Sequence, residues 1–360
     1  MTNLPHYVAQ YSDTNITENA KVKDERFVHI AFAPASHKAN VLVPDQFANV
    51  YRAFKSLFAE HEMPVQEHGT WVWTPIMQMT PEYMSSIIIG AKQEGVDVIY
   101  LSIDSYLDIF SLDHIEAKQT KRLIFENILK QFIYLASKEG IEVDAEAGWR
   151  NWAESGHTYK PFAIVNFVKE FNASNEHKFR GLQYDVEPYL LAEYHENDDG
   201  KGRVLERFVK LVDETASYLA GSGLKFSVVV PEFYDKRDDM TPKFKYNSRK
   251  DFAFGHLLNI LEDLPDSALI IMSYRNFAEG EDGSIEVSEN ELKSAKRGGY
   301  KTNIVIAQET GDVLPPHITF YNTSRLHLKS EVAKLESAFS AHRNFAGIAI
   351  HYANAYLELR

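Results

Sequence analysis

Acidic side chains close several short apolar runs of this sequence. Each of these runs ends on a carboxylate, and the acids concerned are Asp104, Glu146, Glu187, Glu232 and Glu309. Crowded carboxyl groups push one another's pKa values apart, so that one can hold a proton while its neighbour stays ionised. A single acid at such a position would more simply cap the next helix. Several at equivalent positions predict a site for general acid/base chemistry.

The runs that carry these acids alternate with longer segments of helical period. The apolar runs span residues 27–32, 98–103, 141–146, 181–187, 225–232, 268–274, 303–309 and 347–352. Amphipathic segments long enough for crossover helices include 45–62, 113–139, 204–221, 288–299 and 330–343. This alternation is typical of a parallel sheet, and eight βα units predict an α/β fold of the (β/α)8 type, the TIM barrel. The working residues of such a barrel follow the carboxyl ends of its strands.

The chain is expected to form one barrel domain over residues 1–360. Two segments depart from the alternation, near 63–80 and 233–254, and we predict that they are βα loop insertions over the barrel mouth. The first contains Trp71 and Trp73, and the second is rich in charged and aromatic residues. No repeat, low-complexity tract or linker breaks the pattern.

Alternation within the runs predicts which side chains face the barrel interior, because successive strand residues point to opposite faces. In the run 181–187, the polar residues Gln183, Asp185 and Glu187 share one face, and apolar residues share the other. The same parity groups Glu309 with small apolar residues in its run, and His351 with Ala349 in the last run. The polar face is expected to point inward.

Composition limits the classes of partner. The chain has 38 basic and 51 acidic side chains and a net charge of -13. Phosphate neutralisation needs clustered Lys and Arg, so nucleic acid is not an expected partner. The absence of cysteine excludes disulfides, thiolate metal sites and a cysteine nucleophile.

The sequence also bears on targeting. No stretch reaches the roughly 18 apolar residues of a membrane span, and the N-terminus lacks a signal-peptide pattern. We therefore expect no membrane partner and, as the chain is given, a cytoplasmic protein, or a secreted one if a signal was trimmed. The oligomeric state stays open.

Residues 179–187, FRGLQYDVE, resemble the fourth strand of glycoside hydrolase family 18, the chitinase-like barrels, which reads D-x-x-D-x-D-x-E. Asp185 and Glu187 match the last two acids, and Arg180 and Gln183 stand in place of the first two. The resemblance implies that Glu187 is the proton donor. It also implies that Asp185 orients a substrate acetamido group, which is itself the nucleophile in that family.

The sixth strand of the same family reads M-x-Y-D, and the segment MSYR is similar to it. Met272 and Tyr274 match the pattern, and Arg275 stands in place of the Asp. The resemblance implies that Tyr274 donates a hydrogen bond to the substrate.

A second resemblance is to the clan of retaining barrel glycosidases, which places an acid/base Glu after strand four and a nucleophilic Glu after strand seven. VEPY around Glu187 is similar to their N-E-P, with Val186 in place of the Asn, and QETG around Glu309 is similar to their T-E-x-G. The segments DVEPY, MSYR, QETG and GIAIHY also resemble an uncharacterised group of bacterial glycosidase-like barrels.

These resemblances imply a glycoside hydrolase acting on an oligo- or polysaccharide, without a cofactor or metal. Glu187 would be the general acid, with its pKa raised by Asp185 and other carboxylates, and Glu309 the nucleophile or base. Tyr274 would hold the nucleophile or substrate. The residues expected to bind the carbohydrate are Asp104, Glu146, Trp149, Gln183, Tyr189, Glu232, Arg275, His351 and Tyr352. The aromatic members of this set would stack on sugar rings.

Two other functions remain open at this point. A metal-dependent barrel enzyme would use an oxygen-rich divalent site built from Glu146, Asp185, Glu232, Glu309 and His351. In a non-catalytic carbohydrate-binding barrel, Arg180, Gln183 and Arg275 would be substitutions of the family's acids that accompanied the loss of activity. Phosphate-binding glycine loops and a G-x-S-x-G elbow are absent, which disfavours nucleotide and serine-hydrolase chemistry.

Overall fold

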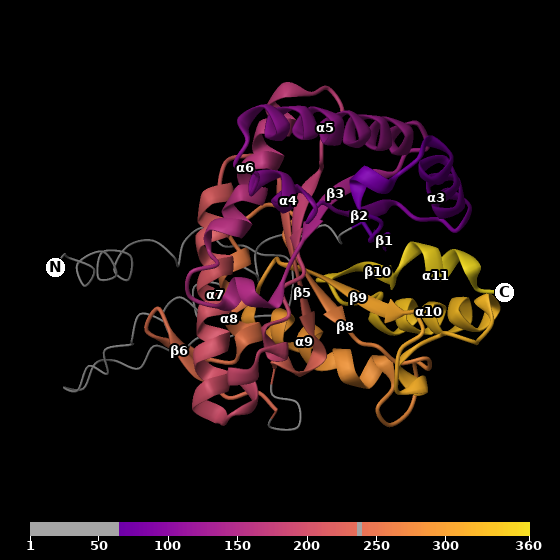
Figure 1. Ribbon diagram of the computed structural model, residues 1–360. Helices are drawn as coiled ribbons and strands as arrows, with labels where there is room; N and C mark the ends of the chain where they lie inside the picture. Colours follow the sequence, from indigo (N-terminus) through magenta and orange to yellow (C-terminus); the bar gives the residue numbers. More distant parts are fainter. Residues whose placement is uncertain (1–64, 236–239) are drawn as a thin grey trace, which may run out of the picture. The chain divides into compact units, whose positions relative to one another are not determined.

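Eight parallel strands close into a barrel in the part of the chain that the structure describes (Figure 1). The structure is a computed structural model, and it describes residues 65–235 and 240–360. Around the barrel the strand order is β1-β10-β9-β8-β5-β4-β3-β2. The strands are β1 (Glu67–Val72), β2 (Val98–Ser102), β3 (Glu142–Ala147), β4 (Gly181–Tyr184), β5 (Lys225–Pro231), β8 (Ala268–Met272), β9 (Asn303–Glu309) and β10 (Phe345–His351). The predicted (β/α)8 fold is confirmed.

Helices connect successive barrel strands, as parallel pairing requires, and a last helix follows β10. They are α3 (Pro81–Gln93), α4 (Tyr106–Phe110), α5 (Ile115–Lys138), α6 (Tyr159–Ser174), α7 (Asp198–Leu219), α8 (Ala253–Leu261), α9 (Ser284–Gly298), α10 (Arg325–Phe339) and α11 (Ala353–Glu358). The sequence marks several of their ends. Thr80 caps α3 by accepting a hydrogen bond from the Tyr83 amide, Asn197 caps α7, and Gly299 ends α9 in the left-handed conformation.

The strand that joins β10 to β2 is β1, and the sequence analysis did not predict it. The run expected as the first strand, 27–32, lies outside the described residues, and the segment expected as a loop insertion near 63–80 contains β1 instead. The sequence pattern of this strand is weak, because EHGTWV has a glycine at its centre and few β-branched residues. Gly69 is required there, since a Cβ would lie 2.6 Å from the ring of Tyr100.

The second expected insertion, near 233–254, lies between β5 and α8. It holds a short antiparallel hairpin of β6 (Phe244–Tyr246) and β7 (Arg249–Asp251). Asn247 and Ser248 form its turn with positive φ angles, which suit a two-residue hairpin loop. That a single domain spans 1–360 stays a prediction, because residues 1–64 are not described.

The alternation predicted a polar face directed inward, whereas both faces of the barrel strands are largely apolar below the mouth. Leu182, Tyr184, Ile304, Ile306 and Ile348 belong to the large core outside the barrel strands. The residues of the smaller interior cluster are Trp71, Val98, Tyr100, Val229, Ile270, Met272, Val305, Ala307, Ala346 and Ala349. Below the mouth this interior is therefore packed with side chains, as in other barrels of this type.

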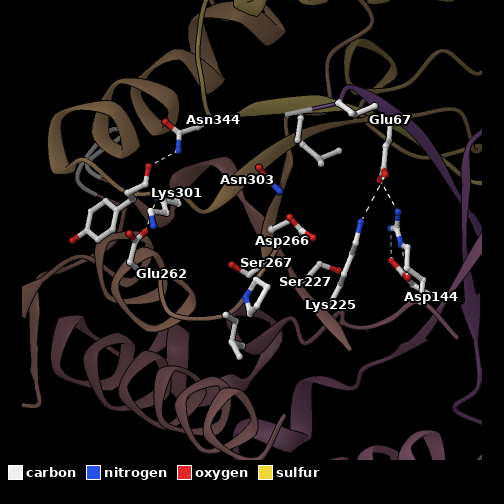
Figure 2. Close-up of a pocket in the computed structure, with 18 of the residues that line it drawn as sticks. Glu67, Asp144, Lys225, Ser227, Glu262, Asp266, Ser267, Lys301, Asn303 and Asn344 are labelled. Carbon is white, nitrogen blue, oxygen red and sulfur yellow. Dashed lines mark hydrogen bonds and ion pairs between the residues drawn. The ribbon is translucent and has the colours of Figure 1, made fainter. Parts of the chain in front are cut away.

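A polar cavity of about 660 Å³ opens at the amino ends of the strands, opposite the end that carries the acids (Figure 2). Arg180, just before β4, lies there and forms two hydrogen bonds to Asp144, at 2.9 and 2.6 Å. Its Nη1 donates to Glu67 at 2.7 Å. The arginine that replaces the first family acid is thus an ion-pair residue of the barrel floor.

Replacing Arg180 by methionine is expected to destabilise the barrel strongly. The Asp144 side chain is only 4% exposed, so the variant leaves a buried carboxylate without its cation. Breaking a buried pair in this way costs about 3–5 kcal/mol in the free energy of unfolding, measured by urea denaturation. The control is Lys210→Met, which removes an exposed pair with Glu214 at 3.7 Å and is expected to cost less than about 0.5 kcal/mol. Equal, small losses in both variants would contradict this role of Arg180.

Candidate active site

The carboxyl ends of the barrel strands bring most of the predicted acids around one phenol. Tyr274 follows β8, and burial raises the pKa of its hydroxyl well above the ordinary value. Negative charges raise it further, and they come from Glu309, Asp185, Glu187 and Glu232. These four acids follow or end three other strands, β9, β4 and β5. The predicted convergence of carboxylates at one end of the barrel is therefore present.

Glu309, the last residue of β9, is held by two N–H donors. The register pairs it with His351 on β10, and His351 Nδ1 lies 2.7 Å from Glu309 Oε2. The backbone amide of Gly311 donates to Glu309 Oε1 at 2.5 Å. A carboxylate that accepts one N–H on each oxygen is stabilised in its ionised form. Glu309 is thus suited to act as an anion at the barrel mouth.

Two further carboxyl groups form a cluster with Asp185 on neighbouring strands, with very few donors. Asp104 and Asp185 follow β2 and β4, and Glu146 lies on β3 between them. Glu146 is 1% exposed, and neither of its carboxyl oxygens has a hydrogen-bond partner of good geometry among the described residues. Burial, followed by the charges of Asp104 and Asp185, raises its pKa well above the ordinary value, and the nearby Ser102 hydroxyl offsets only part of this.

The other two members of this carboxyl cluster are shifted in the same direction. Burial raises the pKa of Asp104 to about 7, against a 3.3 Å hydrogen bond from the Gly148 amide. Burial raises the pKa of Asp185 to about 7 as well, and the charge of Glu187 adds to the effect. Asp185 Oδ1 is buried without a partner. The cluster therefore holds protons near neutral pH, and Asp185 is the shifted acid beside Glu187.

Glu187 is partly exposed at the mouth and accepts a hydrogen bond from the hydroxyl of Tyr189. Tyr189 lies in the short helix η3 (Pro188–Leu190) and packs edge-to-face on Phe233, with ring centroids 5.5 Å apart. The proline after Glu187 starts this turn, so Glu187 and Tyr189 are fixed within one short segment. The DVEPY motif thus positions a carboxyl group and its phenol donor together.

Arg275 and Glu232 form part of the mouth wall. The Arg275 guanidinium pairs with both oxygens of Asp282, at 2.9 and 2.8 Å, and its Nη2 lies 3.5 Å from Glu232. The arginine in place of the family aspartate therefore ties the loop after β8 to the loop after β5. Its side chain is 12% exposed.

The remaining predicted residues divide between the mouth and the packed interior. Trp149 is 55% exposed after β3, with the Arg150 guanidinium 5.3 Å from the centre of its ring. The Tyr352 ring lies 5.2 Å from that of His351. Gln183 is fully buried, accepts a hydrogen bond from Trp71 Nε1 at 2.6 Å and donates to Ser227 at 3.4 Å. Its amide is used inside the barrel, so we do not place Gln183 among the sugar-contacting groups.

Trp73 is a site residue that the sequence analysis assigned to a loop. Its Nε1 lies 2.9 Å from Nε2 of His351, on the opposite side of the ring from Glu309. Trp71 and Trp73 are two residues apart, and this spacing was the available signal that both face the interior from one strand.

Within residues 65–235 and 240–360, no group of three or more His, Asp or Glu side chains is arranged to hold a metal ion. No helix in that part of the chain is long and apolar enough to cross a membrane.

The comparisons with known proteins agree with the barrel fold. No family profile and no curated protein sequence matches the chain. Among solved structures, it is similar to an endo-1,4-beta-D-mannanase from Thermotoga petrophila, with 12% identity and a TM-score of 0.52 over 81% of this chain and 88% of the mannanase. A GH18 chitinase from Pseudoalteromonas aurantia has 11% identity and a TM-score of 0.48, covering 80% of this chain and 94% of the chitinase. At such identity the mannanase likeness establishes the shared fold. The chain is thus a (β/α)8 barrel with a carboxyl-lined mouth.

The raised pKa of Glu146 predicts a pH-dependent stability. An acid whose pKa is higher in the folded than in the unfolded state stabilises most fully below its unfolded value, about 4.3, and loses that contribution as pH rises through the folded value. Glu146→Gln cannot ionise. Relative to wild type, its free energy of unfolding is therefore expected to rise between about pH 5 and pH 8, by on the order of 1–3 kcal/mol.

Urea denaturation at several pH values measures this difference. Glu214→Gln, on the exposed face of α7, is the matched control, and its difference from wild type is expected to stay flat. A flat difference for Glu146→Gln as well would contradict a protonated carboxyl at this position.

Proposed function

We propose that this barrel hydrolyses glycosidic bonds, with Glu187 as general acid and Glu309 as the ionised nucleophile or base. The observation that carries the proposal is the contrast between the two sides of the mouth. On one side Glu309 accepts two N–H hydrogen bonds, and on the other side Glu187 adjoins Asp185, whose pKa is raised to about 7. Two carboxyl groups in opposite protonation states are what glycosidic cleavage requires.

The acid half of the proposal rests on the proton that Asp185 holds beside Glu187. Burial, followed by the charge of Glu187, raises the pKa of Asp185 to about 7, so Asp185 is partly protonated near neutral pH. Asp185 and Glu187 are both partly exposed, but Oδ1 of Asp185 is buried. Glu187 therefore delivers the proton to the leaving oxygen, and Asp185 supplies the neighbouring proton store.

The base half rests on Glu309 and the groups around it. Its two hydrogen bonds fix its orientation. Tyr274, which lies among the same acids, holds a neutral hydroxyl near both halves of the site and donates to substrate or carboxylate. Glu232 and Arg275 close the wall beside it.

A carbohydrate fits the polarity of the mouth. Trp149 presents an exposed ring after β3, and aromatic rings pack against the apolar faces of sugars. The net charge of -13 suits a neutral substrate better than an anionic one. The mannanase with a similar barrel acts on a polysaccharide by its name, which supports the same substrate class here.

Turnover of aryl glycosides and oligosaccharides by the purified chain tests the proposal. Glu187→Gln and Glu309→Gln are each expected to lower kcat by roughly 100-fold or more, because each removes one half of the acid/base pair. Glu214→Gln, on the exposed face of α7, is the comparison variant and is expected to keep the wild-type kcat. Full activity in Glu187→Gln would contradict the assignment of the acid.

The same assay separates the alternative mechanisms. Loss in both variants supports the two-carboxylate mechanism, and loss in Glu187→Gln alone would assign the nucleophile to the substrate. Sugar binding without any turnover by wild type would instead indicate a carbohydrate-binding barrel and overturn the enzymatic proposal.

Trp149→Ala tests the sugar-stacking role separately. Removal of one stacking ring is expected to raise KM about tenfold with little change in kcat, since the ring contributes to binding rather than to the chemical step. Tyr134→Ala on α5 removes another exposed aromatic ring, 42% exposed and outside the site, and is expected to leave KM unchanged. An unchanged KM in Trp149→Ala would remove this residue from the binding site.

A further inference from the structure

Trp73 contacts the ring that holds Glu309, and the proposed function gives it no part. It follows directly after β1, the strand that pairs with β10 (Figure 1). Its indole Nε1 lies 2.9 Å from Nε2 of His351, and the two rings are edge-to-face with centroids 5.6 Å apart. An indole nitrogen only donates hydrogen bonds. His351 Nε2 must therefore accept this bond and carry no proton.

Because Trp73 is the donor to Nε2, the position of the proton on the neutral His351 ring follows. With Nε2 unprotonated, the proton of the neutral ring lies on Nδ1 and is donated to Glu309 Oε2 at 2.7 Å. Protonating Nε2 would place two N–H donors against each other at 2.9 Å. Trp73 thus selects both the tautomer and the charge of His351.

We propose that Trp73 is a positioning residue that keeps His351 neutral and its Nδ1–H directed at Glu309. The proposal rests on the proposed function of Glu309 as an ionised nucleophile or base. A cationic imidazolium beside Glu309 would stabilise the carboxylate too strongly and weaken it as a nucleophile. A neutral ring orients the carboxylate without neutralising its charge.

The groups that face His351 make such a restraint necessary. Glu309 from β9 contacts the ring, and Asp185 after β4 lies close enough for its charge to interact with it. Tyr274 after β8 stacks on the ring, with centroids 6.2 Å apart, and its hydroxyl stays neutral. A carboxylate in contact with an imidazole favours the protonated ring, and Glu309 is the group in that position. Trp73 is the group that opposes protonation at Nε2.

The tautomer can be read without any substrate. In protein labelled with ¹⁵N-histidine, the His351 signal, assigned by its loss in His351→Asn, is expected at pH 7 to show a protonated Nδ1 and an unprotonated Nε2. Trp73→Phe removes the donor and keeps an aromatic ring. Its His351 signal is expected to change to the doubly protonated form at a pH higher by about one unit than in wild type.

Trp71→Phe is the matched control. It also removes an indole N–H, but this one donates to Gln183 and not to His351. The His351 titration is expected to match wild type in this variant, even where the variant is less stable. A shift of similar size in both variants would mean that general disruption of the mouth, and not the Trp73 donor, sets the state of the ring.

Activity gives the second readout. In Trp73→Phe the acidic limb of the kcat/KM profile is expected to move to higher pH, giving a roughly tenfold loss near pH 6 and a smaller loss near pH 8. An unshifted His351 titration in Trp73→Phe would overturn the inference directly. A shifted titration with no movement of the acidic limb would confirm the tautomer control and contradict the proposed role of Glu309, so the two failures are distinguishable.

Discussion

The cost of burying carboxyl groups inside a closed barrel governs the arrangement of this molecule. Parallel strands use their backbone groups in the barrel ladder, so interior side chains must find partners from one another. Where a donor is supplied, the carboxylate is paired. Asp144 has Arg180 at the barrel floor, and Glu309 has His351 and an amide at the mouth. Where none is supplied, burial raises the pKa and the group holds a proton instead, as in Glu146.

The mouth therefore contains two kinds of acid, namely carboxylates with hydrogen-bond donors and buried carboxyl groups without them. The side formed by β9 and β10 contains N–H donors, and the side formed by β2, β3 and β4 contains almost none. Tyr274 lies between them and interacts with acids from both sides. The chemistry proposed for the mouth follows from this asymmetry.

Much of the fold could be predicted from sequence because it depends on local patterns. The seven apolar runs from β2 to β10 correspond to barrel strands, and their alternation separates interior from exterior side chains. β1 was missed because Gly69, which makes room for Tyr100, breaks the apolar pattern. A requirement set by a neighbouring strand is not visible in the run itself.

The acids of the site could be listed from sequence, but their protonation states could not. These states depend on which side chains meet across the barrel, such as Trp71 with Gln183 and Trp73 with His351. Sequence spacing within one strand gives no information on such pairs. The sequence analysis accordingly expected the raised pKa at Glu187, whereas the structure shows raised pKa values at Asp185, Asp104 and Glu146.

The central claim is that protonated and ionised carboxyl groups coexist at this mouth. Infrared spectroscopy at about pH 6 tests it most directly, because the C=O stretch of a protonated carboxyl group is separate from the bands of a carboxylate. The account predicts a protonated-carboxyl band in the folded protein that is reduced in Glu146→Gln and unchanged in Glu309→Gln. A folded protein without such a band, or a band that is lost in Glu309→Gln and kept in Glu146→Gln, would contradict it.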